Sequence, residues 1–224
     1  MKKKMEKLKI TGRSKINRMP VRGSYDRDTI YKILDESFIC QIGFNIDKQV
    51  NIIPTLYGRK DDSIFIHGSK NSRMLKSFET GQDICISVTL IDGIVLARSA
   101  FHHSVNYRSV VLFGKPIIVK SEEKKKEGLN VIMDQIISGR WEDVRKPNEN
   151  ELNVTSIYKI KINEASAKIR TGSAVDDKDD LDLNVWAGVL PLKTIADEPM
   201  RNPDLKENIG LPDYLHNYNM KIRK

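Results

Sequence analysis

The sequence lacks the features that mark membrane-spanning and secreted proteins. No apolar run in its 224 residues approaches the about 18 residues of a transmembrane helix. The lysine-rich N-terminus is not followed by a continuous apolar stretch, so we expect no signal peptide and a cytoplasmic protein. There are only two cysteines, Cys40 and Cys85, and both lie in apolar, strand-like segments. This predicts reduced core residues rather than a disulfide.

Several catalytic signatures are also absent. No CxxC or HExxH motif suggests a zinc site, and no GxSxG motif suggests a serine hydrolase. A Walker loop and a GxGxxG fingerprint are missing as well, and the aspartates between residues 176 and 182 do not follow the calcium-loop pattern. His102 and His103 are expected on one strand, where neighbouring side chains point to opposite faces and cannot chelate one metal together.

The positive charge is concentrated at one end of the chain. Residues 1–22 hold nine basic residues and one acidic residue, which equals the net charge of +8, so the remaining chain is neutral. No aromatic residues alternate with these cations in the manner of base-stacking proteins. We expect residues 1–22 to form a flexible basic arm. DNA binding through this arm is a weaker alternative.

Apolar periodicity predicts a mainly β protein. Alternation over residues 38–46, a return over 50–57 and a third run ending at His67 are typical of antiparallel strands joined by tight turns. Further strands are expected near 84–90, followed by a break at Asp92 and Gly93, near 110–119, with an interruption at Gly114 and Pro116, and near 157–162. Helices are expected near 25–37, 72–78, 122–137 and 148–152. About six strands favour one six-stranded antiparallel barrel of Greek-key type, closed or half-closed, over residues 23–192, followed by an extension over 193–224.

The stretch over residues 65–78 has the composition of a binding site. Gly68 allows a tight backbone path, and Ser72 is placed to cap a short helix. Two hydroxyls, of Ser69 and Ser72, and two cations, Lys70 and Arg73, fall within five residues. This indicates a phosphate cradle, although a capped helix with solvated cations would have the same composition.

Three segments carry a family resemblance. Residues 64–75, 100–110 and 186–192 together resemble the flavin-nucleotide-binding branch of the pyridoxamine phosphate oxidase-like family, which includes the nitroimidazole-resistance proteins. The similarity extends from Ser24 to Leu192 in the expected order. It implies a split β-barrel homodimer with one FMN in each of two clefts between the subunits. The oxidase's C-terminal Arg-x-His motif is absent, which argues against oxidation of pyridoxamine phosphate.

The resemblance also implies roles for individual residues. Ser69, Ser72 and Arg73 would hold the FMN phosphate, with Lys70 substituting for the cation that the oxidase has at the position of Met74. The remaining expected contacts are Pro54, Thr55 and Leu56 along the ring edge, Ile66, His67 and Gly68 beneath the phosphate, Arg108 and Ser109 from the long strand, and Trp186 as a cleft wall or an interface aromatic.

These residues support three functional hypotheses. The first is an FMN-dependent oxidoreductase acting on a small nitro-aromatic or quinone-like molecule, with His67 donating a proton or a hydrogen bond. In the simpler interpretation, His67 only satisfies a backbone carbonyl at a strand end. The second hypothesis is a flavin carrier or sensor without turnover. The third keeps the barrel but binds haem, with His102 or His103 as the axial ligand.

Overall fold

The computed structural model describes residues 6–216 and residue 218 of the chain. The strands are β1 Gly23–Ser24, β2 Ile39–Ile46, β3 Gln49–Lys60, β4 Ser63–Ser69, β5 Ile84–Leu96, β6 Ser104–Gly114, β7 Ile117–Ile118, β8 Thr155–Lys161, β9 Glu164–Arg170 and β10 Gly188–Pro191. The α-helices are α1 Arg27–Asp35, α2 Arg73–Phe78, α3 Glu122–Ile136, α4 Arg140–Asp143, α5 Glu149–Val154 and α6 Asp213–His216. Three short 3-10 turns cover Pro20–Arg22, Ala100–His102 and Lys178–Asp180.

All ten strands belong to one antiparallel sheet. Their order is β1-β9-β6-β5-β2-β3-β4-β8-β7, and β10 pairs with β5. Within the described residues β1 and β7, at the two ends of this order, do not pair with each other, so the sheet stays open. The prediction of a mainly antiparallel β fold is confirmed. The prediction of six strands was too low, because the small-residue strand β9 and the short strands β1, β7 and β10 carry little apolar periodicity.

One half of the sheet curls around a hydrophobic core. Ile42, Ile86 and Leu112, on three neighbouring strands, are fully buried there. Helix α2 places Phe78 against this core, where its ring meets the rings of Phe44 and Tyr158 edge-on at centroid distances of 6.2 and 5.2 Å. Both cysteines are free, and Cys40 is buried in the same core, as the sequence predicted.

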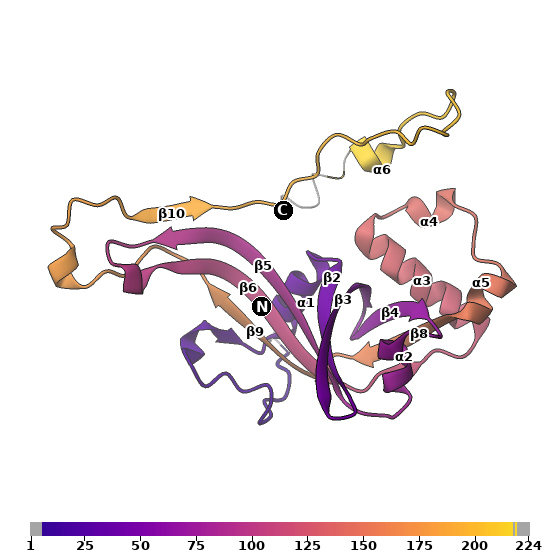
Figure 1. The fold of residues 1–224 in the computed structure, drawn as a ribbon, viewed down its shortest axis with the longest axis horizontal. Helices are drawn as coiled ribbons and strands as arrows, with labels where there is room; N and C mark the ends of the chain where they lie inside the picture. Colours follow the sequence, from indigo (N-terminus) through magenta and orange to yellow (C-terminus); the bar gives the residue numbers. More distant parts are fainter. Residues whose placement is uncertain (1–5, 217, 219–224) are drawn as a thin grey trace, which may run out of the picture.

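The other half of the sheet extends away from this curled, barrel-like half, which we call the barrel for short. Strands β5 and β6 pair along almost their full lengths, and β9 and β10 flank them, as Figure 1 shows. The break expected at Asp92 and Gly93 is a β-bulge inside one continuous strand, where the register shifts between Ile91 and Gly93. A bulge bends a strand without ending it. The predicted interruption at Gly114 and Pro116 does separate β6 from β7.

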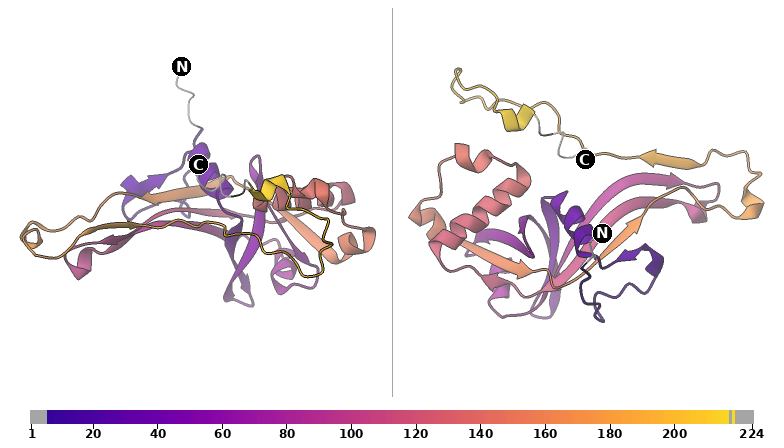
Figure 2. Two further views of the ribbon diagram at one scale, coloured as in Figure 1. Left: turned by 90° about the horizontal axis from the view of Figure 1, so that it is seen from above. Right: turned by 180° about the vertical axis from the view of Figure 1, so that it is seen from behind.

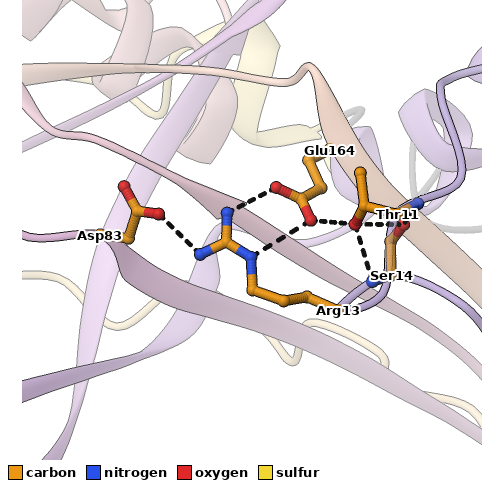
Figure 3. Close-up of polar contacts among 5 residues, drawn as sticks. All are labelled: Thr11, Arg13, Ser14, Asp83 and Glu164. Carbon is orange, nitrogen blue, oxygen red and sulfur yellow. Dashed lines mark hydrogen bonds and ion pairs between the residues drawn. The ribbon is translucent and has the colours of Figure 1, made fainter.

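Part of the segment over residues 6–22 contacts the curled half of the sheet, although most of its side chains are exposed or half-buried. Leu8 is only 4% exposed and belongs to the core. Arg13 forms ion pairs with Asp83 at 2.6 Å and Glu164 at 2.5 Å, and Thr11 donates a further hydrogen bond to Glu164 (Figure 3). Counter-charges on the barrel therefore hold part of the basic segment in place. Lys2, Lys3 and Lys4 lie outside the described residues.

Helix α3 covers the outer face of β4 and of the C-terminal end of β3 around Gly58. Ser121 caps this helix by accepting a hydrogen bond from the backbone N–H of Lys124. Gly58 allows the close approach, because a Cβ at this position would lie 2.4 Å from the carbonyl oxygen of Val131. No helix in the described part of the chain combines the length and the apolar character needed to cross a membrane.

The C-terminal segment returns along the molecule after β10. Figure 2 shows it running outside the sheet toward α6. There the hydroxyl of Tyr214 accepts a hydrogen bond of 2.8 Å from Arg140 of α4. Between β10 and α6, Ile195 and Met200 are 65% and 97% exposed. The division of the chain at residues 22 and 192 stays a prediction.

Candidate functional site

The corner between β4 and α2 gathers the predicted phosphate-binding residues. Ser72 is the N-cap of α2, yet its side chain makes no capping hydrogen bond. Among the contacts of residues 6–216 and 218, the Ser69 hydroxyl accepts only a 3.2 Å hydrogen bond from the backbone N–H of Asn71. Within the described residues neither Lys70 nor Arg73 forms an ion pair. Two hydroxyls and two cations therefore remain available to an anion at this corner.

Ile66 and His67 lie on opposite faces of β4. Ile66 is fully buried in the barrel core. His67 pairs across the ladder with Ile157, which packs with Phe65 under α3. Residues directly opposite in an antiparallel pair share a face, so the imidazole lies on the α3 side of the sheet. Gly68 lies on the inner face, where a Cβ at this position would lie 3.1 Å from the Cδ1 of Leu75.

The imidazole of His67 has an unusual environment. Its Nδ1 is buried and has no hydrogen-bond partner in the described part of the protein. Burial lowers the pKa of His67 below its ordinary value of 6.5. The ring is therefore neutral at pH 7 and offers one donor and one acceptor nitrogen. The backbone carbonyl contact that the simpler interpretation assigned to His67 is not made through Nδ1.

The β3 residues predicted for the ring edge lie one strand from this corner. β3 pairs with β4, and Tyr57 stands opposite Ile66. Pro54 and Leu56 face outward on this strand, and Leu56 is 36% exposed, whereas Thr55 is half-buried on the other face. The structure thus brings residues 54–56 and 66–73 into one region.

Arg108, Ser109 and Trp186 do not join this region within one chain. β6 is separated from β4 by β5, β2 and β3. Arg108 donates to Asp92 at 2.7 and 2.9 Å and is also paired with Glu36, so two carboxylates already neutralise it. The Ser109 hydroxyl donates to the Lys168 carbonyl at 3.2 Å. Trp186 precedes β10 and is 67% exposed.

A second site, which we call the histidine pocket, lies at the extended end of the sheet. It is a cavity of about 500 Å³. Four of the lining residues are cations, and none is acidic. The lining residues are Arg18, Met19, Arg22, Phe101, His102, His103, Ser104, Tyr107, Lys168 and Arg170. The sequence singled out the two histidines, but no local pattern joined them to cations from the N-terminal segment and β9.

The two histidines do not occupy one strand, contrary to the sequence-based expectation. His102 ends the 3-10 turn Ala100–His102, and His103 follows it immediately before β6. The Nε2 of His102 lies 3.0 Å from the carboxylate of Asp177. The Nδ1 of His103 lies 2.9 Å from the Ser99 carbonyl oxygen. The turn therefore gives each ring a different fixed partner.

A third cavity, of about 750 Å³, lies between α3, α4 and β3. Both cations in its lining are compensated, because Arg59 pairs with Asp35 at 2.5 Å and Lys60 pairs with Glu127 at 2.6 Å. No predicted cofactor-binding residue lines it. Among the described residues, no group of three His, Cys, Asp or Glu side chains is arranged to hold a metal ion.

Comparison with known proteins identifies the fold family. The family model described as pyridoxamine 5'-phosphate oxidase matches residues 26–169, more than half of the chain. The chain belongs to the pyridoxamine 5'-phosphate oxidase family. This confirms the resemblance found in the sequence. No curated protein matches the chain.

Two solved structures are similar over nearly the whole chain. A flavocytochrome from Azotobacter vinelandii is 33% identical, with a TM-score of 0.88 over 92% of this chain and 96% of its own. A FAD- and haem-binding protein from Mycobacterium smegmatis is 30% identical, with a TM-score of 0.84 over 88% of this chain and 97% of its own. A structure from Bacteroides thetaiotaomicron, named as a candidate 5-nitroimidazole antibiotic resistance protein, is 18% identical, with a TM-score of 0.56 over 66% of this chain and 86% of its own. This last likeness supports the fold alone.

Proposed function

We propose that this protein is a flavin-dependent redox protein whose corner between β4 and α2 holds the flavin phosphate. The observation that carries the proposal is the set of uncommitted donors there, the hydroxyl of Ser72 and the charges of Lys70 and Arg73. The family assignment and the flavin named for the two most similar proteins described above support it. When bound, a flavin supplies the electron transfer, and the chain supplies binding and orientation.

The form of the flavin is a finer proposal. The sequence resemblance predicts FMN, whereas FAD is named for the Mycobacterium smegmatis protein. The two share the phosphate-bearing flavin half that the corner would bind. Mass spectrometry of the ligand released from purified protein distinguishes them.

Removing a corner cation tests the phosphate site. Arg73→Ala should weaken flavin binding about tenfold, because one charge-assisted phosphate contact is lost. Arg145→Ala is the matched control, since Arg145 is an exposed cation that pairs with Glu151 at 2.7 Å outside the corner. Flavin affinity is measured by fluorescence titration of the apoprotein. Equal affinities of both variants and the parent protein would contradict the proposed site.

Within this proposal, His67 contributes a neutral imidazole. Its lowered pKa makes a hydrogen-bond role at pH 7 more favourable than the role of a charged acid. Turnover separates an oxidoreductase from a carrier or sensor. NAD(P)H oxidation with a panel of nitro-aromatic and quinone acceptors should exceed that of free flavin if the protein is an enzyme, and His67→Gln should lower kcat.

We also propose a homodimer formed through the outer face of β2 and β3. Ile39, Val50, Ile52 and Leu56 on this face are between 36% and 76% exposed. Ile39 stands opposite Leu56 in the ladder, so these side chains form one apolar surface. A second copy would also be the source of Trp186, which does not reach the corner within one chain.

A matched pair of substitutions tests this interface. Val50 and Val175 are both 76% exposed, but only Val50 lies on the β2–β3 face. Val50→Glu should shift the protein toward the monomer in light-scattering chromatography, and Val175→Glu should not, because a charge is costly only where a partner buries it. A parent protein that is monomeric throughout would overturn the proposal.

A second cofactor is favoured by the histidine pocket. Two histidines and four cations line it, and both similar proteins described above are named for haem or as a flavocytochrome. We therefore propose that the chain binds haem there in addition to flavin. The absorption spectrum of the purified protein tests both cofactors, because bound flavin gives two broad visible bands and ligated haem gives a sharp Soret band.

A further inference from the structure

The histidine pocket combines apolar and cationic walls. Met19 and Phe101 are 45% and 88% exposed, and the Phe101 ring stands edge-on to the His102 ring at 5.2 Å. Arg18, Arg22, Lys168 and Arg170 supply the charge. A ligand that matches both walls has a flat apolar body and more than one negative group. Haem, an apolar macrocycle with two carboxylates, meets this description.

Arg170 is the strongest sign of an anionic ligand. It is only 6% exposed, yet its described partners are all neutral oxygens: Asn106 Oδ1, the Gly172 carbonyl at 3.5 Å and the Ser173 carbonyl at 3.3 Å. Its Nε is buried and has no partner within the described residues. A buried guanidinium without a counter-charge is unfavourable. A carboxylate entering the pocket would supply both the missing acceptor and the missing charge.

A second cation lies close to Arg170. Burial and then the positive charge of Arg22 lower the pKa of Arg170. Arg22 itself has no described side-chain hydrogen bond or ion pair in residues 6–216 and 218. Arg22 and Arg170 line the same pocket, which has no acidic lining residue, so an anion that contacts both would be stabilised there.

The two histidines are not equivalent as metal ligands. A carbonyl oxygen can only accept a hydrogen bond, so the Nδ1 of His103 must carry the proton that it donates to Ser99. In the neutral ring, Nε2 at the exposed tip then keeps its lone pair. This is the usual arrangement of a metal-binding histidine, in which the second nitrogen is fixed by a backbone carbonyl. His102 instead has its Nε2 occupied by Asp177, which leaves only the nitrogen next to the main chain.

We propose that His103 is the axial ligand of the haem through Nε2 and that Arg170 and Arg22 hold the haem carboxylates. This assignment rests on the haem binding proposed above. It assigns the haem iron to one of two adjacent histidines and gives the buried Arg170 an anionic partner. Haem iron supplies the redox or oxygen chemistry, and these side chains fix the position of the group.

Haemin titration of the flavin-loaded protein tests the axial ligand. His103→Ala should lose the sharp Soret band of the ligated haem and bind haemin roughly 10- to 100-fold more weakly, and added imidazole should restore the spectrum. His102→Ala should keep the ligated spectrum. His216→Ala, in exposed α6, is the matched control and should behave as the parent protein. Loss of the band in His102→Ala with retention in His103→Ala would overturn the choice of ligand.

Haemin dimethyl ester lacks the carboxylate charges. It therefore tests whether Arg22 and Arg170 hold the haem carboxylates, an arrangement that we call the cationic clamp. The parent protein should prefer haemin to the ester by about tenfold or more, and Arg22→Gln and Arg170→Gln should each reduce this preference. Because Arg170 is buried, Arg22→Gln provides the readout if Arg170→Gln does not fold. Arg145→Gln should leave the preference unchanged. An equal affinity of the parent protein for both compounds would overturn the clamp.

The same samples separate this inference from the proposed cofactors. If neither the parent protein nor any variant binds haemin, the proposed haem binding is wrong, and so are the histidine and arginine assignments that depend on it. If Arg22→Gln and Arg170→Gln lose flavin while their haemin preference is unchanged, the pocket binds the flavin nucleotide instead. Retention of flavin in every variant leaves the corner between β4 and α2 as the flavin site.

Discussion

The barrel end and the extended end of the sheet differ in what their side chains contact. At the barrel end, Ile42, Ile64 and Leu112 are fully buried among other side chains of the same chain. At the extended end, Phe101 is 88% exposed, and the guanidinium of Arg170 is buried without a counter-charge in the described residues. The first region supplies folding stability from within the chain. The second has exposed apolar and buried charged side chains that would be satisfied by the haem proposed above.

The largest expected effect is a difference in the free energy of unfolding between substitutions at Phe78 and at Phe101. Phe78→Ala should reduce the free energy of unfolding by about 3–5 kcal/mol, because Phe78 is 2% exposed and contacts two other rings. Phe101→Ala should change it by no more than about 0.5 kcal/mol. Urea unfolding of the apoprotein measures both values. A similar loss in the two variants would show that the extended end also carries folding stability.

Two glycine-to-alanine substitutions compare how tightly the backbone is constrained in the two regions. Gly58→Ala should cost about 1–3 kcal/mol, because the new Cβ would lie 2.4 Å from the Val131 carbonyl and α3 would have to shift. Gly172, after β9, has nothing within 4 Å but a φ of +96°, so Gly172→Ala should cost about 1 kcal/mol through backbone strain alone. Hydrogen exchange in α3 should rise only for Gly58→Ala. A rise in both variants would contradict this difference.

The sequence predicted the barrel end better than the extended end. The hairpin of β2 and β3, the corner from Ser69 to Arg73 and the helix α3 all have strong local patterns, and each lies where its pattern indicates. β9 was not predicted, because its alanines and serine are buried beside β6 without producing apolar alternation. The bulge at Asp92 was taken for a break, since glycine and aspartate usually mark turns.

The histidine pocket could be predicted only in part. His102 and His103 were visible as candidate ligands, but their placement at the end of a 3-10 turn and directly after it depends on the end of the β5–β6 ladder. The four cations come from residues 18–22 and β9, which are far apart in the sequence. No periodicity relates such segments. Only the pairing of β9 with β1 and β6 brings them together.

The docked N-terminal segment gives a smaller, pH-dependent effect. Arg13 lowers the pKa of Glu164 below its ordinary value of 4.5, through a hydrogen bond and its charge. The ionised carboxylate therefore stabilises the fold at neutral pH, and this contribution is lost as the pH falls below about 4.5 through the lower folded pKa. Because Arg13 is 46% exposed, Arg13→Ala should cost about 1 kcal/mol or less at pH 7. Urea unfolding at pH 7 and below the pKa of Glu164 should show the difference disappear, and a constant difference would contradict the ion pair.

The smallest effect concerns His67, the one predicted catalytic residue, at the barrel end. Burial lowers its pKa in the folded state below the ordinary value of 6.5, so between these two values the unfolded chain binds more protons than the folded chain. Stability should therefore decrease as the pH falls from about 7.5 to about 5, and His67→Gln should flatten this slope. His216→Gln, at an exposed position, should leave the slope unchanged. The Nδ1 of His67 has no partner among the described residues. If flavin reaches it, flavin loading should alter the slope in the parent protein and not in His67→Gln. An identical slope in the apo and loaded forms would place the imidazole away from the cofactor and leave it a structural residue under α3.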